Sequence, residues 1–235
     1  MRVLVTRPAD QAARTVKNLA ARGHHALVAP VLEIVPTGAT PPDGPFDLVL
    51  ATSAQAFAAR RGLARQLRAA PVACVGDMTA QAAREAGFAV TFVAPRAEAL
   101  ADRLIAEIGS ARALYLAGRE RKPLLEERLG AAGWGLVVVE TYAAQAVAHW
   151  PDEVKAALDA GMIDAALHYS PRSARLALSL MGADAAARLS HFCLSGEVAA
   201  VCESWVALER IFTPSQPDEE ALMSLLGSVE PLRGE

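Results

Sequence analysis

The chain alternates short runs of Val, Leu and Ala with longer stretches in which apolar positions recur at helical spacing. The short runs, such as RVLV near the start, predict buried strands, and stretches such as DQAARTVKNLAARG predict amphipathic helices of about 10 to 15 residues. Helical stretches of this kind end at glycine, a common helix terminator. The alternation of strands and helices predicts parallel sheets that carry helices on both faces.

The pattern of apolar residues occurs twice along the chain, as an internal repeat. The equivalent segments are LVTR and LAGR, ending at Arg7 and Arg119; DLVLATS and DAALHYS, ending at Ser53 and Ser170; and VAC and HFC, ending at Cys74 and Cys193. We interpret this self-similarity as the duplication of a unit of roughly 110 residues, the size of one small domain. About five strands in each copy favour an α/β fold with two flavodoxin-like, doubly wound parallel sheets.

Composition is that of a globular chain with sizeable aliphatic cores: 235 residues, 53% hydrophobic and 5% aromatic. A net charge of −3 and the lack of a basic run argue against nucleic acid as a partner. Uncharged runs fall short of the roughly 18 apolar residues that a membrane span needs. The chain opens directly on a strand pattern without a signal peptide, and its three cysteines lack C-x-x-C spacing, so we expect buried free thiols and a cytoplasmic location.

Candidate chemistry gathers where the predicted strands end, because doubly wound sheets bind ligands beyond the carboxyl ends of their strands. The segments at these ends are small, hydroxylated or rich in glycine: TRP (6–8), TS (52–53), GDMT (76–79), AGR (117–119), ETY (140–142), YSPRS (169–173) and SGE (195–197). Taken singly, Ser53 and Ser170 are explained as helix N-caps, with Pro171 at the first helical position. Taken together, several helix N-termini that open on the same side indicate a site for anions.

The sequence lacks the motifs of nucleotide-binding, nucleophilic and metal sites. The glycines of GAAGWG (130–135) follow a helix and precede a strand, the reverse of a dinucleotide-binding loop, and no phosphate-binding loop or nucleophile elbow is present. The five histidines show no metal-ligand spacing, and His168 is predicted to be a packed or hydrogen-bonded core residue. We therefore expect neither a metal nor a cofactor.

The ordered series LVTRP, DLVLATSAQA, VACVGDMTAQA, ETYAAQ, HYSPRSA and CLSGEVA resembles the uroporphyrinogen-III synthase family over nearly the whole chain, from Arg2 to about Leu226. The resemblance implies two flavodoxin-like domains joined by a pair of linker strands, and no metal or cofactor. It also implies that sequential copies are not the spatial domains. The first domain is expected to combine residues 1–36 with 150–235, the second to span 41–146, and the linkers to lie at 36–41 and 145–151.

The reaction implied by the resemblance is the cyclisation of hydroxymethylbilane to uroporphyrinogen III in haem biosynthesis, with loss of water and inversion of the terminal pyrrole ring. Loss of the hydroxyl from the first ring leaves a reactive azafulvene-type cation. Attack at the substituted carbon of the last ring, through a spiro intermediate, then gives the correct isomer. Such a lyase acts chiefly by positioning its substrate, with some help to the departing hydroxyl.

The resemblance also assigns residues. Tyr142 and Thr79 are the expected catalytic residues, and the expected substrate contacts are Arg7, Thr52, Ser53, Gly76, Gly118, Arg119, Ser170, Pro171, Ser195, Gly196, Glu197 and Val198. Many members of the family carry a hydroxyl residue where this chain has Val198, and often proline where it has Gly196. The loop at 195–198 is therefore expected to contribute backbone N–H groups rather than hydroxyls.

Two other classes of function stay open on the sequence. A non-catalytic protein that binds an anionic small molecule between two domains would share the same pattern. A transferase with two nucleotide-binding-like domains would need a nucleotide site that the glycine pattern does not provide. On the favoured interpretation the partner is a linear tetrapyrrole, without nucleic acid or membrane, and the protein acts as a monomer.

Overall fold

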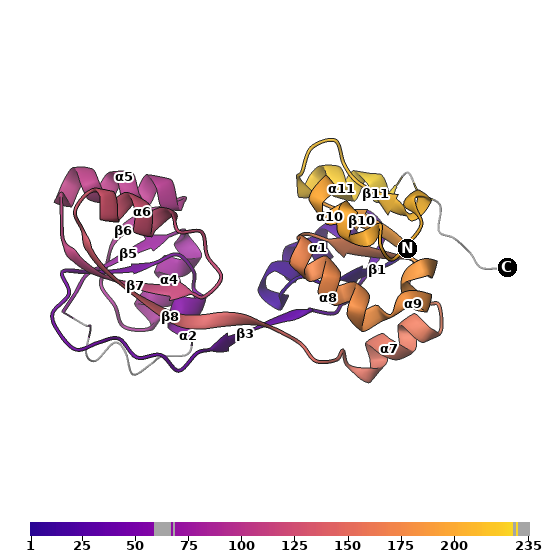
Figure 1. Ribbon diagram of the computed structural model, residues 1–235, viewed down its shortest axis with the longest axis horizontal. Helices are drawn as coiled ribbons and strands as arrows, with labels where there is room; N and C mark the ends of the chain where they lie inside the picture. The colour runs from indigo at the N-terminus through magenta and orange to yellow at the C-terminus, as the bar shows by residue number, and fades with distance from the viewer. Residues whose placement is uncertain (59–66, 68, 228, 230–235) are drawn as a thin grey trace. The chain divides into compact units, whose positions relative to one another are not determined.

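In the computed structural model of the chain, the described residues are 1–58, 67, 69–227 and 229 (Figure 1). The chain divides into two compact units. Unit 1 combines Met1–Glu33 with Gln145–Glu235, and unit 2 is the continuous segment Ile34–Ala144. Among the helices that the structure describes, none combines the length and the apolar character needed to cross a membrane.

The sheet of unit 1 has the strand order β11-β10-β9-β1-β2, and its paired strands are parallel. The strands are β1 (Arg2–Val5), β2 (His25–Val28), β9 (Ala165–His168), β10 (Ser190–Cys193) and β11 (Ile211–Phe212). Every residue of β9 and β10 is buried. Burial on both faces explains why these strands are short apolar runs rather than alternating ones.

Helices cover both faces of this sheet. They are α1 (Ala9–Ala20), α7 (Asp152–Asp159), α8 (Pro171–Met181), α9 (Ala183–Arg188), α10 (Gly196–Cys202) and α11 (Glu219–Leu226), with a short 3₁₀ turn η1 (Leu208–Arg210) before β11. Apolar residues of α7, α8, α9 and α10 form one core with Leu4, Ala166 and Cys193. Residues of α1 and α11 form the opposite core with strand residues such as Val3 and Phe192.

Unit 2 repeats this architecture. Its sheet has the order β3-β8-β7-β4-β5-β6, with strands β3 (Leu32–Pro36), β4 (Leu48–Ala51), β5 (Val72–Val75), β6 (Val90–Ala94), β7 (Arg112–Gly118) and β8 (Gly135–Ala146). Among the described residues, the helices of unit 2 are α2 (Gln55–Ala58), α4 (Asp77–Glu85), α5 (Ala97–Ile108) and α6 (Leu124–Ala131). Cores under α2 and α4 on one face, and under α5 and α6 on the other, sandwich the sheet (Figure 1).

The two segments that pass between the units, β3 and β8, are neighbours in the sheet of unit 2. The Thr37 N–H donates to the Thr141 carbonyl at 3.1 Å, and the Val147 N–H donates to the Val31 carbonyl at 3.1 Å. From the second of these contacts to the first, residue numbers rise from Val31 to Thr37 but fall from Val147 to Thr141, so the two strands are antiparallel. β8 is therefore longer than its neighbours, since it continues along β3 after β7 has ended.

Strand order accounts for the internal repeat. When β7, β8, β4, β5 and β6 are matched with β1, β2, β9, β10 and β11, the two sheets have the same order, that of a flavodoxin-like fold. The registers agree as well: Cys193 lies opposite His168 in unit 1, and Cys74 lies opposite Ala51 in unit 2. The expected α/β fold with parallel, doubly wound sheets is confirmed.

Candidate active site

Three neighbouring parallel strands of unit 2, β7, β4 and β5, end at one edge of its sheet. The segments that begin there follow Gly118, Ala51 and Val75. The chain continues from β7 to β8 on one side and from β4 to β5 on the other, so the strand order reverses between β7 and β4. Open α/β sheets bind ligands at such a reversal.

Tyr142 lies at this edge. It pairs with Gly118 in the register of β7 and β8, directly after a register irregularity between Ala117 and Gly118. The expectation that Tyr142 follows the end of its strand is wrong, because β8 continues to Ala146 along β3. Half of the residues of β8 are partly buried.

Gly118 is what allows the Tyr142 ring to lie over the end of β7. A Cβ atom at Gly118 would lie 2.6 Å from Cε2, 2.7 Å from Cζ and 2.9 Å from the hydroxyl oxygen of Tyr142. These distances are shorter than van der Waals contact, and the neighbours are the rigid ring and its hydroxyl. Any side chain at position 118 would therefore push the half-buried tyrosine away from the strand end.

A second tyrosine, Tyr115, approaches the same edge from inside the sheet. Its side chain is 2% exposed, and its hydroxyl shares a 3.0 Å hydrogen bond with Oγ1 of Thr52, the residue after β4. Burial raises the pKa of Tyr115, and Tyr142 is close enough to contribute to this electrostatically. Tyr115 therefore stays a neutral phenol that fixes the Thr52 hydroxyl.

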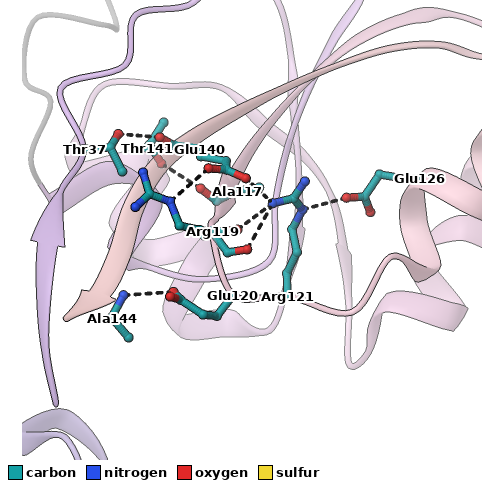
Figure 2. Close-up of polar contacts among 10 residues, drawn as sticks. Thr37, Ala117, Arg119, Glu120, Arg121, Glu126, Glu140, Thr141 and Ala144 are labelled. Atoms are coloured by element: carbon teal, nitrogen blue, oxygen red, sulfur yellow. Dashed lines mark hydrogen bonds and ion pairs between the residues drawn. The ribbon is translucent and has the colours of Figure 1, made fainter. Parts of the chain in front are cut away.

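The turn after β7 is held by the ion-pair network shown in Figure 2. Arg121 donates to Glu140 at 3.1 Å, to Glu126 at 2.6 Å and to the Gly118 carbonyl at 2.9 Å. Arg119 donates through Nε to Glu140 at 3.2 Å, and its backbone N–H donates to the Tyr142 carbonyl at 2.9 Å. The hydrogen bonds from Arg121 and Arg119 lower the pKa of Glu140. Arg121 thus anchors the turn whose glycine supports Tyr142, and Arg119 is tied to the strand beside it.

The helices after β4 and β5 begin at the same edge. Gly76, with φ 80°, precedes α4, and Thr79 in the first turn of α4 is 4% exposed. Asp77 is the first residue of that helix and places a negative charge where an anion would bind. Ser53 accepts from the Gln55 N–H through its hydroxyl at 3.3 Å and from the Ala56 N–H through its carbonyl at 3.1 Å, so it closes the turn into α2.

In unit 1 the neighbouring strands β1, β9 and β10 end at a common edge in the same way. Ser170 is the N-cap of α8: its hydroxyl accepts from the Ser173 N–H at 3.2 Å, and Pro171 is the first helical residue. The predicted N-cap is confirmed. The first turn of α8 contains no acidic residue, in contrast with α4 and α10.

The segment at 195–198 begins α10. Ser195 is its N-cap residue without a side-chain capping bond, and the Glu197 side chain is exposed in the first turn. Val198 is 2% exposed and packs in the core under α8 and α10. Its side chain therefore points into the protein. Gly196 has open surroundings, since a Cβ atom added there would meet no described atom within 4 Å.

Arg7, after β1, is engaged within unit 1. Its guanidinium donates to Glu219 at 3.1 Å and to Thr15 at 3.3 Å, and it stacks 4.1 Å from the centre of the Tyr169 ring. Burial acts to raise the pKa of Glu219, but hydrogen bonds from Thr15, Arg14 and Tyr169 and the positive charge of Arg7 together lower it. The arginine fastens the end of β1 to α11, which limits its freedom to bind a ligand.

Adjacent parallel strands bring together two histidines that are far apart in sequence. His168 Nε2 lies 2.9 Å from His191 Nδ1, and His191 Nε2 lies 3.0 Å from the Ala186 carbonyl oxygen. Both histidines and Cys202 are fully buried, with potential ligand atoms within 4.8 Å of one another. Because the facing ring nitrogens already share a hydrogen bond, we assign them no metal. The prediction of a hydrogen-bonded core His168 is confirmed.

The family model described as uroporphyrinogen-III synthase HemD matches residues 13–224. The chain belongs to the uroporphyrinogen-III synthase family. Its reaction is the cyclisation of hydroxymethylbilane to uroporphyrinogen III, with loss of water and inversion of the terminal ring, in haem biosynthesis. A search of curated proteins found no match.

A solved structure of a uroporphyrinogen-III synthetase shares the fold, and a second solved synthase is a weaker match. The synthetase of Helicobacter pylori is 17% identical, with a TM-score of 0.60, and the alignment covers 98% of this chain and 100% of that one. A mutant synthase of Thermus thermophilus is 18% identical, with a TM-score of 0.48, and the alignment covers 97% and 96% of the two chains.

For a uroporphyrinogen-III synthase, the edge of unit 2 offers hydroxyl groups and glycine backbone at the ends of its strands. The residues at or directly after the ends of its strands are Thr52, Ser53, Gly76 and Gly118, and the Tyr142 ring lies over Gly118. In unit 1, Ser170 and Ser195 begin helices at the corresponding edge. No described side chain among them is a strong base, which suits a reaction that needs positioning and one proton donor.

Sequence reasoning missed Tyr115, Arg121 and Glu219. Tyr115 had a usable signal, since a tyrosine inside a strand of Ala and Leu needs a partner for its hydroxyl when it is buried. Arg121 lies in the charged run from Arg119 to Lys122, a pattern that favours a solvated surface, but its side chain is only 23% exposed. Glu219 had no signal, because it contacts Arg7 across 212 positions of sequence.

Proposed function

We propose that Tyr142 donates a hydrogen bond or proton to the departing hydroxyl on the first ring of hydroxymethylbilane. The observation that carries this proposal is the placement of its ring over Gly118, where the strand order of unit 2 reverses. Hydroxide is a poor leaving group, and a phenol within hydrogen-bond reach assists its departure as water. Thr79, at the start of α4, is the second proposed catalytic residue and orients the substrate beside Tyr142.

The acetate and propionate groups of the substrate need hydrogen-bond donors, although the protein has a net charge of −3. Backbone N–H groups at helix N-termini supply them without a net charge. Among the longer helices that begin at these strand ends, α8 suits an anion best because its first turn carries no acid, whereas α4 begins with Asp77. We therefore assign a substrate carboxylate to the start of α8.

The remaining substrate contacts are proposed on the same grounds of position at a strand end. They are Arg7, Thr52, Ser53, Gly76, Gly118, Arg119, Ser170, Pro171, Ser195, Gly196, Glu197 and Val198. Pro171 has no N–H and Val198 is buried, so these two contribute shape and the backbone of their neighbours. Arg7 and Arg119 would have to share their guanidinium groups with Glu219 and Glu140.

The experiment that tests the proposal starts from freshly generated hydroxymethylbilane. The protein is incubated with it, the products are oxidised to porphyrins, and chromatography separates isomer III from isomer I. Isomer III in excess, with and without EDTA, supports catalysis that needs no metal. Formation of isomer I at the spontaneous rate, together with tight binding of the product, would instead support the non-catalytic binding protein.

We further propose that the protein works as a monomer in the cytoplasm. Its three cysteines are free and buried, which suits a reducing compartment. Light scattering coupled to size-exclusion chromatography tests the monomer, and a mass of twice 24.7 kDa would contradict it.

A further inference from the structure

Two cysteines of unit 1 that flank the 195–198 segment in sequence lie in contact. Cys193 is the last residue of β10 and Cys202 the last residue of α10, and their Sγ atoms are 3.6 Å apart. Both are free thiols and fully buried. The chain between them contains Ser195 and Gly196 at the start of α10 (Figure 1).

Unit 2 shows that the fold does not require the buried polar side chains of His168, His191 and Cys202. The residues at the positions of His168, His191 and Cys202 are Ala51, Val72 and Ala83, and the strand registers of the two sheets agree. Cys74 occupies the position of Cys193 but faces no second thiol, because Ala83 replaces Cys202. Buried polar side chains cost free energy unless they are hydrogen-bonded, and Nδ1 of His168 is buried without a hydrogen-bond partner among the described residues, so unit 1 carries a cost that unit 2 avoids.

The surroundings of the two thiols give Cys193 and Cys202 different pKa values. The Ala186 carbonyl can only accept, so His191 Nε2 carries the proton and His191 Nδ1 accepts from His168 Nε2–H. A hydrogen bond from the Cys193 thiol lowers the pKa of Cys202 and outweighs the opposing effect of burial. The same hydrogen bond and burial raise the pKa of Cys193. Cys202 is thus the better nucleophile, and Cys193 lies beside it as a protonated thiol.

We propose that Cys193 and Cys202 are an oxidisable pair that a small peroxide converts to an intramolecular disulfide. The Cys202 thiolate attacks one oxygen of hydrogen peroxide, which releases hydroxide and leaves Cys202 as a sulfenic acid. Cys193 then attacks the Cys202 sulfur, and the second hydroxide leaves and takes up the Cys193 proton as water. In sum, two thiols and one peroxide give one disulfide and two waters. Unit 2 has no equivalent reaction.

The test uses the full chain, reduced and freed of reductant, then treated with hydrogen peroxide at neutral pH. Thiols that remain are alkylated after denaturation, and tryptic peptides are measured by mass spectrometry. Leu189–Arg210 carries both Cys193 and Cys202 and contains no internal Lys or Arg, whereas Cys74 lies alone in Ala69–Arg84. We expect the first peptide to appear unalkylated and lighter by two hydrogens, while Cys74 remains alkylated.

The matched controls are Cys202→Ala, which introduces the residue that unit 2 already accommodates, and Cys74→Ala. The first should abolish the disulfide, and the second should form it at the wild-type rate. The same treatment in urea shows that the chain can form the bond when unfolded. The proposal is overturned if the native pair stays fully alkylated under peroxide that cross-links it in urea, or if Cys74 is oxidised as fast as the pair.

Discussion

At the scale of single residues, the site of unit 2 depends on one glycine and one arginine. Gly118 leaves room for the Tyr142 ring, and Arg121 holds the Gly118 carbonyl at 2.9 Å. The arginine is itself fixed by Glu126 and Glu140. The position of the tyrosine hydroxyl is therefore set by backbone and by partly buried ion pairs, not by the tyrosine alone.

His168 makes stability depend on pH. Burial, and to a lesser degree His191, lower its pKa from an ordinary 6.5 to about 3. As pH falls below about 6.5, His168 is protonated in the unfolded chain but stays neutral in the folded protein. The free energy of unfolding therefore falls as pH drops from 6.5 towards 3, and this group has no effect above 6.5. At about 1.4 kcal/mol per pH unit, the loss between pH 6.5 and 5 is about 2 kcal/mol.

Urea unfolding of wild type and His168→Gln at pH 7.5 and pH 5 measures this effect. The glutamine can still donate to His191 but does not titrate, so the variant should lose less stability than wild type between the two values. Equal losses in both proteins would show that His168 is not the group responsible.

At the scale of elements, substrate binding depends on which helix N-termini accept an anion. Arg172 is exposed in the first turn of α8, and Arg175 is exposed on the same helix one turn later. Arg172→Glu places an acid at the N-terminus, where helix-dipole effects are worth about 0.3–1 kcal/mol, and removes a positive charge. We expect the KM for hydroxymethylbilane to rise about 3- to 10-fold.

The matched variant Arg175→Glu makes the same change in charge farther from the helix start, and its KM should change less. Steady-state kinetics on both variants separates a local effect from one of net charge. Equal increases in KM would mean that no substrate carboxylate lies at the start of α8.

Elements differed in how well the sequence predicted them, for physical reasons. The start of α8 was predictable because two adjacent residues determine it: Ser170 favours the N-cap position, and Pro171 favours the first helical position. The continuation of β8 past Tyr142 was not, because it depends on pairing with β3, about a hundred residues earlier in the chain. The Arg7–Glu219 contact was hidden for the same reason. Local signals predicted the strand-end segments, and only the fold revealed which of their side chains were already engaged.

At the scale of the whole molecule, the chain forms two units whose boundaries differ from those of the sequence repeats. Unit 2 is continuous, whereas unit 1 is interrupted between Glu33 and Gln145. The 3.1 Å hydrogen bond between Val147 N–H and the Val31 carbonyl places the two ends of the interruption side by side. We propose that each unit folds alone.

Two shortened chains test this proposal. One contains residues 34–144, and the other joins Glu33 to Gln145 through a short Gly-Ser linker. Each should unfold in a single cooperative urea transition, because each retains the central strands of its sheet with a core on both faces. If neither chain shows a cooperative transition, the units are not independent domains.

The most direct test of the account is the isomer ratio formed by Tyr142→Phe. This variant removes one hydroxyl and keeps the ring that packs over Gly118, so it should fold as wild type and bind product. We expect isomer III to form about 10²-fold more slowly or worse, as is typical for loss of a general acid, while spontaneous isomer I accumulates. Tyr169→Phe, which removes a hydroxyl bonded to Glu219 at 3.1 Å, is the matched control and should keep most of its turnover. Full turnover in Tyr142→Phe, with loss of turnover in Thr79→Ala and Ser170→Ala, would contradict the proton-donor role and leave substrate binding as the main work of the site.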